Sequence, residues 1–422
     1  MDFMYYGSTL VADLSTGKTE TVDFVEVDEV GPGLAAGLSL LRKYEGGDPI
    51  VIGSGLLTGT TAPAGCLGFV LGRSPVTGEP AVGPLPLFAG AEVKLSGFAM
   101  VVVTGESDGP VYLWLHDGVA DILDASELAG LDTWQTTDII RREMGEPLIQ
   151  VISIGPAGEA RSPMASYSIN YWGSGDSAAL GAVMGAKNLK AVAARGLGMV
   201  DADDPAGYYR ASTGILARTS VVTGFAGTCG WPGAPDLDGW LKPMTHRHRS
   251  CFACPGACFP FVKYREPPDV LESSGVEEPG MLVTSAAAAM WLEGGGWGAE
   301  PACRAMEAMS REGVDMVRGA RELAPKPLTE ELEIIEAVKG LEGTEVAGWP
   351  GGPETGYGLF GPWVPPLADE RGWLEANRIG YVTGICPIYL LTSGIDDGDL
   401  LELCGPAAGV ELDAAAVERM FS

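Results

Sequence analysis

Short apolar runs, interrupted by Gly, Pro and Asp, dominate the first 200 residues of the chain. Their length and their content of β-branched side chains are typical of strands. The polar residues 15–18 predict one hairpin turn, and Asp117 with Gly118 predicts another. We expect strands at residues 10–13, 19–24, 49–52, 67–71, 99–104, 111–116, 119–123, 148–154 and 191–195.

Apolar positions at helical spacing become more frequent after residue 201. Pro301 suits a first helical position, and Thr329 suits the cap of a helix that carries Leu332, Ile335 and Val338 on one face. We expect helices at residues 33–44, 134–144, 177–185, 206–219, 301–318, 329–339, 385–391 and 413–421.

Residues 340–372 are rich in Gly, Pro and Trp, and they predict little regular structure. The whole pattern predicts an α+β fold with two domains. The first, residues 1–200, is rich in β-strands, and the second, residues 201–422, is mainly helical.

Composition narrows the class of protein further. The chain has 422 residues, 46% of them hydrophobic, and a net charge of −29. Such an acidic surface argues against nucleic-acid binding, which needs clustered Lys and Arg. The first ten residues lack the basic start of a signal peptide, and the longest apolar run, residues 281–292, is too short to cross a bilayer. We therefore expect a cytoplasmic protein with no membrane partner.

Three of the eight cysteines stand close together, as Cys251, Cys254 and Cys258 in a C-x2-C-x3-C pattern. A tight run of thiols plus one distant cysteine is typical of an iron–sulfur cluster. Zinc is an alternative, because His246 and His248 lie just upstream and could complete a Cys3His site. A third alternative is a set of free or buried thiols, since neighbours this close cannot all pair as disulfides.

Several motifs, taken in order, resemble the aldehyde ferredoxin oxidoreductase family of tungstopterin enzymes. The resemblance covers about residues 5–320 and again residues 375–422. The motifs are the opening hairpin at 10–17, the segments at 55–63, 73–78, 94–97 and 154–159, the helix at 181–191, and the cysteine run at 251–258.

This resemblance implies an N-terminal domain of two β-sheets followed by helical domains that cover a cofactor. It implies that Cys251, Cys254 and Cys258 hold a [4Fe-4S] cluster. The fourth family ligand lies in a late D-x-x-G-L-C motif, which corresponds here to residues 381–386 and ends on Cys386. Two further positions of the family's pterin motifs correspond to Gly384 and Asp315, which we expect to bind cofactor.

The chain departs from the family where the pterin binds. Leu67 replaces an Arg that lies between cluster and pterin, and Tyr381 replaces an Asp that helps to hold the pterin. The polar and Arg-rich family segments correspond to residues 84–87 and 173–180, which include Asp176. An anionic pterin phosphate prefers Arg and backbone amides, so these changes weaken its site. No His follows His248, although the family carries a catalytic His later.

Two functional hypotheses follow from this resemblance and from the departures at the pterin site. In the first, the protein keeps the fold and the cluster, has a degenerate pterin site, and serves as an electron-transfer or partner subunit for ferredoxin or a full-length paralogue. In the alternative, it is an active tungsten- or molybdenum-pterin oxidoreductase that converts an aldehyde to a carboxylate with ferredoxin as acceptor. Both allow a homo- or hetero-oligomer.

One basic segment is expected to form an exposed loop near the cluster. It contains Arg247 and Arg249 with the two histidines, and it could meet an acidic ferredoxin. The remaining cysteines are interpreted as core or incidental thiols, namely Cys66, Cys229, Cys303 and Cys404.

Overall fold

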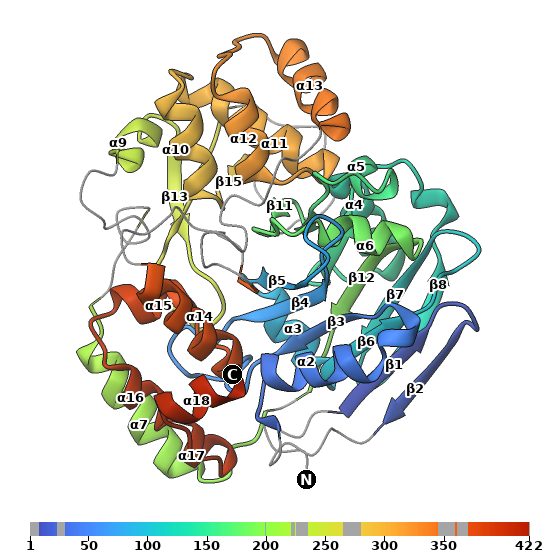
Figure 1. The fold of residues 1–422 in the computed structure, drawn as a ribbon. Helices are drawn as coiled ribbons and strands as arrows, with labels where there is room; N and C mark the ends of the chain where they lie inside the picture. The colour runs from blue at the N-terminus through green and yellow to red at the C-terminus, as the bar shows by residue number, and fades with distance from the viewer. Residues whose placement is uncertain are drawn as a thin grey trace.

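The computed structural model describes residues 8–22, 30–198, 200–220, 224, 235–264, 280–344, 359–360 and 370–421. Two six-stranded sheets form its N-terminal part, and helices form most of the remainder (Figure 1). The predicted fold class, an α+β fold with an N-terminal part of two β-sheets and a mainly helical second part, is confirmed. The division of the chain into domains at residue 200 stays a prediction.

The first sheet has the strand order β2-β1-β6-β3-β4-β5. Strands β1 and β6 are parallel, and every other neighbouring pair is antiparallel. Its strands are β1 (Ser8–Asp13), β2 (Lys18–Val22), β3 (Ile50–Ser54), β4 (Gly68–Arg73), β5 (Pro80–Leu85) and β6 (Phe98–Thr104).

The second sheet repeats this plan, with the order β11-β10-β9-β12-β7-β8 and one parallel pair, β12 with β7. A third sheet of three short strands, β13-β14-β15, follows later in the chain. The strands are β7 (Val111–His116), β8 (Val119–Asp124), β9 (Gln150–Ile154), β10 (Tyr167–Ile169), β11 (Trp172–Gly173), β12 (Leu189–Arg195), β13 (Thr245–Arg249), β14 (Phe259–Val262) and β15 (Met281–Leu282).

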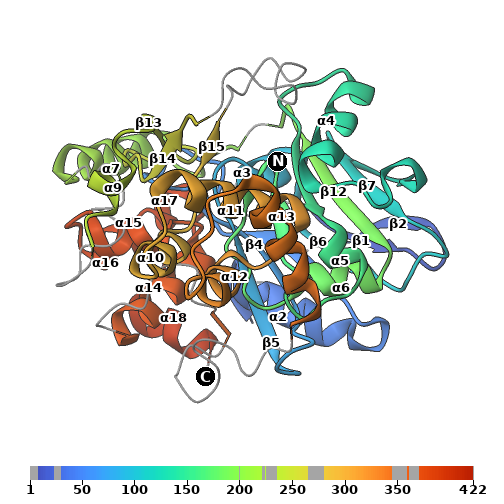
Figure 2. The ribbon, with the colours of Figure 1, turned by 90° about the horizontal axis from the view of Figure 1, so that it is seen from above.

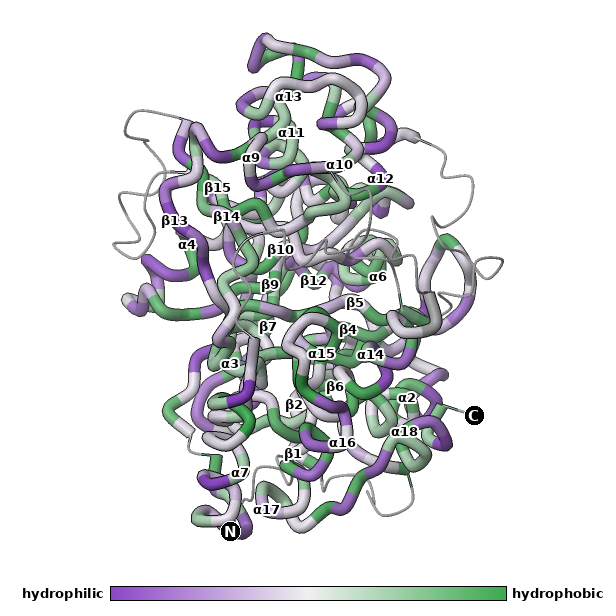
Figure 3. The backbone as a smooth tube through the Cα atoms, turned by 90° about the vertical axis from the view of Figure 1, so that its left-hand side faces the viewer, coloured by the Kyte–Doolittle hydropathy of each residue, from purple (hydrophilic) through white to green (hydrophobic). Residues whose placement is uncertain are grey.

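One hydrophobic core joins the two large sheets. Alternate residues of a strand face the same side, so Ile50 and Ile52 of β3 enter this core together with Ile152 and Ile154 of β9. Helix α6 (Leu180–Ala186) packs into the same core. In Figure 3, hydrophobic colour gathers along the central strands, whereas hydrophilic colour is frequent on outer helices such as α13 (Glu331–Gly340).

The later helices form two groups, seen at the top and bottom of Figure 1. The upper group, which Figure 2 views from above, surrounds one core cluster. The lower group surrounds another. The remaining helices are α2 (Leu34–Lys43), α3 (Ala89–Leu95), α4 (Thr133–Met144), α5 (Pro156–Glu159), α7 (Pro205–Arg218), α9 (Leu237–Leu241), α10 (Ala286–Gly294), α11 (Ala299–Glu312), α12 (Met316–Leu323), α14 (Glu370–Thr383), α15 (Pro387–Thr392), α16 (Asp397–Leu401), α17 (Cys404–Ala408) and α18 (Ala414–Met420).

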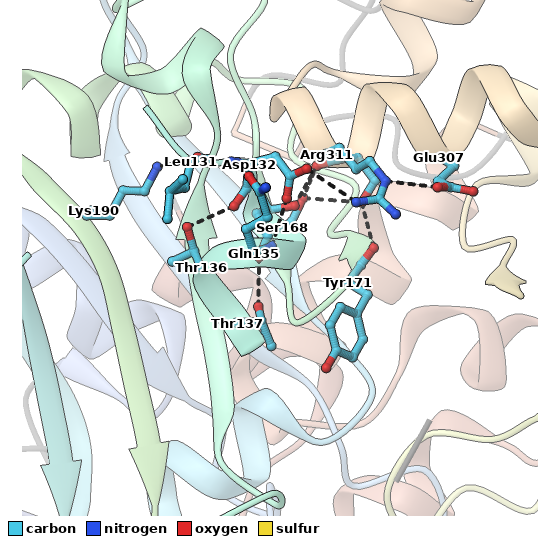
Figure 4. A network of polar contacts seen from close by, with 12 residues as sticks. Leu131, Asp132, Gln135, Thr136, Thr137, Ser168, Tyr171, Lys190, Glu307 and Arg311 are labelled. Carbon is cyan, nitrogen blue, oxygen red and sulfur yellow. Dashed lines mark hydrogen bonds and ion pairs between the residues drawn. The ribbon is translucent and has the colours of Figure 1, made fainter. Parts of the chain in front are cut away.

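A polar network ties α4, beside the second sheet, to α11 of the upper helical group (Figure 4). Arg311 pairs with Asp132 at 3.2 Å and with Glu307 at 2.8 Å, and its guanidinium lies 3.9 Å from the ring centre of Trp134. Asp132 also closes a capping box with Gln135 at the start of α4. One arginine therefore connects a helix cap, an aromatic ring and a nearly buried carboxylate.

Most predicted strands are confirmed, because their alternation and turn residues agree. Asp117 and Gly118 both adopt positive φ angles, 45° and 78°, as the tight turn between β7 and β8 requires. Strand β5 was not predicted, because Pro80 and Pro84 obscure its pattern.

Two helix predictions are wrong in detail. The predicted helix at 301–318 is two helices, because Gly313 ends α11 in a left-handed conformation and Asp315 caps α12. Pro301 is the third residue of α11 instead of the first. Helix α13 starts after Glu330, with no cap from Thr329, and Leu332 is 77% exposed. Most of residues 340–372 lie outside the described residues.

Candidate functional site

Three segments that are far apart in the sequence meet around the predicted cysteine ligands. The loop between β3 and β4 carries Cys66, the loop between β13 and β14 carries the C-x2-C-x3-C run, and Cys386 directly precedes α15. The amide of Ala64 donates to the carbonyl of Ala253 at 3.0 Å, and the amide of Cys386 donates to the carbonyl of Ala64 at 3.0 Å. Ala64 thus joins the other two segments through its own backbone.

The thiols of these segments are close enough to interact. Cys251 and Cys386 both raise the pKa of the Cys66 thiol, so their thiols lie near it. Cys254 and Cys258 both interact electrostatically with Cys251 and Cys386. The structure therefore brings the four predicted ligands together, and none of these cysteines is in a disulfide. Cys66, which we interpret from the sequence as a core or incidental thiol, is fully buried near them.

Cys66 gave no sequence signal, because it stands alone, far from the cysteine run. The loop around it is well fixed. Thr58 Oγ1 donates to the carbonyl of Leu67 at 2.6 Å, and the amide of Leu67 donates to the carbonyl of Gly384 at 2.9 Å. Lys94 Nζ donates to the carbonyls of Gly55 and Leu56 at 3.1 and 2.6 Å, and burial lowers the pKa of Lys94 to about 7.

Leu87, like Ala64, holds the cysteine run through backbone hydrogen bonds. Its amide lies 3.3 Å from the sulfur of Cys251, to which it donates, and its carbonyl accepts from the amide of Phe252 at 2.9 Å. Backbone N–H groups that donate to a sulfur stabilise its thiolate form and tune a bound metal. Leu87 is a residue that sequence analysis could not identify, because any residue type can supply this amide.

Three non-glycine residues at the site adopt left-handed backbone conformations. They are Ala64, Leu87 and Ala253, with φ angles of 58°, 61° and 49°. Such conformations cost free energy in non-glycine residues and concentrate at functional sites. Each of the three makes one of the backbone contacts that hold the thiols together, so the strain coincides with the geometry of the site.

The pKa values of the site thiols shift in two directions. Burial raises the pKa of the Cys254 and Cys258 thiols, which favours their neutral form when no metal is bound. The pKa of Cys66 is also raised, first by its hydrogen bond with Cys251. The pKa of Cys386 is lowered, first by the hydrogen bond from Cys66 and also by the amides of Ile388 and Tyr389. Partly buried thiols gathered in this way fit a cationic cluster that binds them as thiolates.

The zinc alternative finds less support. Among the described residues, no group of three or more His, Cys, Asp and Glu side chains could hold a single metal ion. A four-iron cluster distributes its thiolates over separate irons, so that result concerns single-ion sites only. His246 and His248 lie on strand β13 and not in the exposed loop that we expected. His248 Nε2 is 3.7 Å from Asp238 Oδ1.

Asp315 and Gly384, the two predicted cofactor contacts, already have structural partners. Asp315 is buried, accepts from the amides of Val317 and Arg318, and forms an ion pair with the Arg318 guanidinium. Gly384 has a φ of 88°, and a Cβ there would lie 2.1 Å from Thr58 Oγ1. Both residues thus have a role in the fold, and their binding of cofactor stays a prediction.

The positions that depart from the family motif are apolar and packed. Leu67 is 1% exposed, and Tyr381 stacks on Phe360 with ring centres 5.6 Å apart. Asp176 is fully buried, and burial raises its pKa to about 7. One feature nearby fits a polar ligand, because Nη1 and Nη2 of buried Arg318 have no hydrogen-bond partner among the described residues. Taken together, these positions offer a pterin phosphate little positive charge.

A pocket of about 280 Å³ opens beside Leu87. Its walls include Phe88 and three arginines, Arg141, Arg195 and Arg249. Leu87 therefore both lines this pocket and contacts the sulfur of Cys251. Within the described residues, no helix is long and apolar enough to cross a membrane.

Comparisons with known proteins find relatives for part of the chain. Residues 9–196 match the family described as aldehyde ferredoxin oxidoreductase, N-terminal domain. The chain is similar to the tungsten-containing aldehyde ferredoxin oxidoreductase of Pyrococcus abyssi, with 38% identity over 37% of this chain and 26% of that protein. Its counterpart in Pyrococcus horikoshii is 34% identical over 48% of this chain and 35% of that protein.

Two other similarities concern multisubunit proteins. The WOR-like subunit of an aliphatic sulfonate oxidoreductase from Pyrococcus furiosus is 27% identical over 46% of this chain and 35% of that subunit. A chain of the active-site complex BamBC of benzoyl coenzyme A reductase, solved with 1,5-dienoyl-CoA, has the same fold, with a TM-score of 0.75 and 16% identity. That match covers 99% of this chain and 87% of the other. The curated relatives are thus matched over about a third of their length.

Proposed function

Residues 9–196 match the N-terminal domain of the aldehyde ferredoxin oxidoreductase family, and from this premise we propose that the chain is a member of that family and serves as an iron–sulfur electron-transfer or partner subunit. In this proposal Cys251, Cys254, Cys258 and Cys386 hold a [4Fe-4S] cluster. The observation that carries the proposal is the meeting of these thiols from separate segments, joined through the backbone of Ala64.

A cluster of this kind would supply one-electron transfer. The residues of the chain give it an enclosed position. Leu87 donates its amide to Cys251, and the buried side chain of Leu67 lies in the loop that carries Cys66. A low-dielectric shell of this sort excludes water and sets the potential of a bound cluster.

The degenerate pterin site is the reason for proposing a partner subunit. Leu67 and Tyr381 are apolar and fully packed, Gly384 is in contact with Thr58, and Asp315 is paired with Arg318. The raised pKa of Asp176 shows that a carboxyl group is buried here, where an added anion would face repulsion above pH 7. None of these arrangements favours an anionic cofactor.

The pocket beside Leu87 supports a route for electrons to a partner. Arg195 and Arg249 line it, and so does Leu87, whose amide donates to the sulfur of Cys251. Glu92 also lines the pocket and pairs with Arg195 at 2.7 Å, so Arg249 is the arginine on which we base the attraction of an acidic protein, and we propose ferredoxin or a full-length paralogue as the partner. The similarity to a WOR-like subunit supports a role inside a hetero-oligomer.

The alternative is an active oxidoreductase that uses tungsten or molybdenum with pterin to convert an aldehyde to a carboxylate. Two observations favour it. The relatives are named tungsten-containing enzymes, and Arg318 has two buried nitrogens without a partner among the described residues. In this alternative those nitrogens would hold a polar group of the cofactor.

Metal and pterin content of the anaerobically purified protein tests these proposals. We expect about four iron atoms per chain, with no stoichiometric tungsten, molybdenum or pterin. Iron together with tungsten or molybdenum and pterin would support the alternative and call for aldehyde assays. Zinc without iron would contradict both.

A further inference from the structure

The pocket of about 280 Å³ beside Leu87 combines apolar walls with a buried guanidinium group. We propose that it binds a small organic anion, with an apolar ring inside the pocket and a carboxylate on Arg141. This inference goes beyond the proposed electron-transfer function and does not rest on it, because the residues that line the pocket are not the predicted cluster ligands.

The walls of the pocket are largely apolar. Trp172 is 1% exposed, and its ring lies edge-on to those of Trp134 and Tyr171, with ring centres 5.5 and 5.6 Å away. Phe88 and Leu148 also line the pocket and are 39% and 48% exposed, so they form its mouth. Walls of this kind favour a ligand whose body is apolar, because its surface leaves water on binding.

Arg141 supplies the charge that selects an anion. It lies on α4, lines the pocket and is 5% exposed. Its Nε donates to the carbonyl of Ile149 at 3.0 Å, and its Nη1 donates to the Tyr171 hydroxyl at 3.3 Å. These two bonds fix the guanidinium plane and use only some of its N–H donors. The rest of the group is therefore positioned in advance for a ligand in the pocket.

The acidic residue nearest along the chain does not occupy Arg141. Asp138, one turn earlier on α4, accepts from the Tyr171 hydroxyl at 2.6 Å. Its charge offsets part of that of Arg141, but among the described residues Arg141 forms no ion pair. A carboxylate from outside the chain would supply the missing direct partner, and the planar guanidinium matches its two oxygens.

The other polar side chains of the lining are held by the fold. The Asn170 side chain accepts from the backbone of β9 and donates to Gln150, both at 2.9 Å. Glu92 pairs with Arg195 at 2.7 Å. Among the described residues the lining thus contains one carboxylate, already paired, and three guanidinium groups, in a chain whose net charge is −29. Such a lining favours an anion over a cation.

Fluorine NMR of 4-fluorophenylacetate, added to the full chain with its bound metal retained, tests the proposal. 4-Fluorophenylacetamide has the same ring and no charge, and inorganic phosphate, used as a competitor, has charge and no ring. Leu148→Asp places a carboxylate at the exposed mouth of the pocket. Leu332→Asp is the matched control, because Leu332 is 77% exposed on α13 and does not line the pocket. Arg141→Lys keeps a positive charge and loses the planar guanidinium.

We expect 4-fluorophenylacetate to bind the wild type and Leu332→Asp with equal affinity. Binding should be about fivefold weaker in Leu148→Asp, because like charges repel at the mouth. It should be about tenfold weaker in Arg141→Lys, and the uncharged amide should bind the wild type about tenfold more weakly than the acid. If Arg141→Lys folds poorly, the comparison of Leu148→Asp with Leu332→Asp decides the case.

Four results would overturn the inference. They are no binding at millimolar concentration, equal binding of the amide and the acid, competition by phosphate as strong as that by unlabelled phenylacetate, and equal affinities in Leu148→Asp and Leu332→Asp. The last would place the ligand elsewhere on the protein. A wild-type protein without iron would contradict the proposed function and leave this test of the pocket unaffected.

Discussion

The amide of Cys386 donates a 3.0 Å hydrogen bond to the carbonyl of Ala64, so a late cysteine is fixed to a loop of the N-terminal domain. The same alanine donates to Ala253 within the cysteine run. The geometry of the thiols thus depends on contacts between separate parts of the fold and not on the C-x2-C-x3-C loop alone. The predictions below test this arrangement and its surroundings.

Removal of one predicted ligand should release iron. In Cys258→Ser we expect iron to fall from about four atoms per chain to below about one, because a cubane cluster needs all of its thiolates. Elemental analysis with the visible absorption spectrum would measure this. Cys404→Ser is the control, since Cys404 is another free thiol but lies in α17. Equal iron in both variants would contradict the ligand assignment.

Gly384→Ala should destabilise the protein by about 3 kcal/mol. Gly384 has a φ of 88°, and the new Cβ would lie 2.1 Å from Thr58 Oγ1 and 2.7 Å from the Thr58 amide. Chemical denaturation would give the free energy of unfolding. Gly214→Ala is the control, because Gly214 lies inside helix α7 with open space around it. That change should stabilise the protein by about 0.5–1 kcal/mol. If Gly214→Ala were the more destabilising of the two variants, the packing described around Gly384 would be contradicted.

Arg311→Met should cost about 3 kcal/mol of unfolding free energy, because it removes a cationic partner of a buried carboxylate, which keeps its contact with the neutral Tyr264 hydroxyl. Glu307, whose side chain is 4% exposed, would lose the ion pair shown in Figure 4, and Asp132 would lose its contact to α11. Arg218→Met is the comparison, since the Arg218 side chain is 56% exposed in its pair with Asp399. That surface pair should be worth less than about 1 kcal/mol. Similar losses in the two variants would count against a structural role for the network.

Asp176→Asn should change how stability depends on pH. Burial, the largest cause, raises the pKa of Asp176 from 3.8 to about 7, with Asp315 also raising it and Arg318 lowering it. The folded state therefore holds a proton that the unfolded state releases. The protonation of Asp176 in the folded state contributes to the free energy of unfolding. This stabilisation is fully present below pH 3.8 and is lost as the pH rises through about 7.

Asn cannot ionise, so the gain in melting temperature of Asp176→Asn over the wild type should increase between about pH 4 and pH 8. Thermal unfolding across that range measures the difference. Asp201→Asn, at an exposed position, should run parallel to the wild type. A constant difference for Asp176→Asn would mean that this carboxyl group is ionised throughout.

Arg249→Glu should slow electron transfer to an acidic ferredoxin by about tenfold at low salt, and the difference should shrink as ionic strength rises. The reason is that Arg249 lines the same pocket as Leu87, whose amide donates to the sulfur of Cys251. Stopped-flow oxidation of the reduced protein measures the rate. Arg210→Glu carries the same charge change on exposed helix α7 and should have a smaller effect. Equal effects of the two variants would mean that the rate depends on the net charge of the protein and not on docking near Arg249.

The sequence predicts the strands well, because β-branched runs and turn residues report local geometry. Residues 111–116, for example, coincide with β7. It predicts the division between α11 and α12 poorly, since the helical pattern continues across Gly313 while the backbone there turns left-handed at a φ of 69°. A glycine inside a periodic pattern is ambiguous until the neighbouring elements are known.

The site shows the same contrast. The cysteine run can be found by its spacing, and Cys386 by resemblance to a family motif, but Cys66 and Leu87 cannot. Cys66 is an isolated cysteine in the sequence, and Leu87 acts only through its amide. Both reach the site through long-range contacts, which no local pattern encodes.

The separation of the thiols along the chain has a consequence for biogenesis. Cys66, Cys251 and Cys386 come from three segments, and the last of them precedes α15 near the C-terminal end of the given sequence. Contacts of such high sequence separation form late in folding, because the chain must first close large loops. Metal incorporation would therefore follow the docking of α14 and α15 onto the N-terminal sheets, and iron content would report whether a newly made chain has completed its tertiary fold.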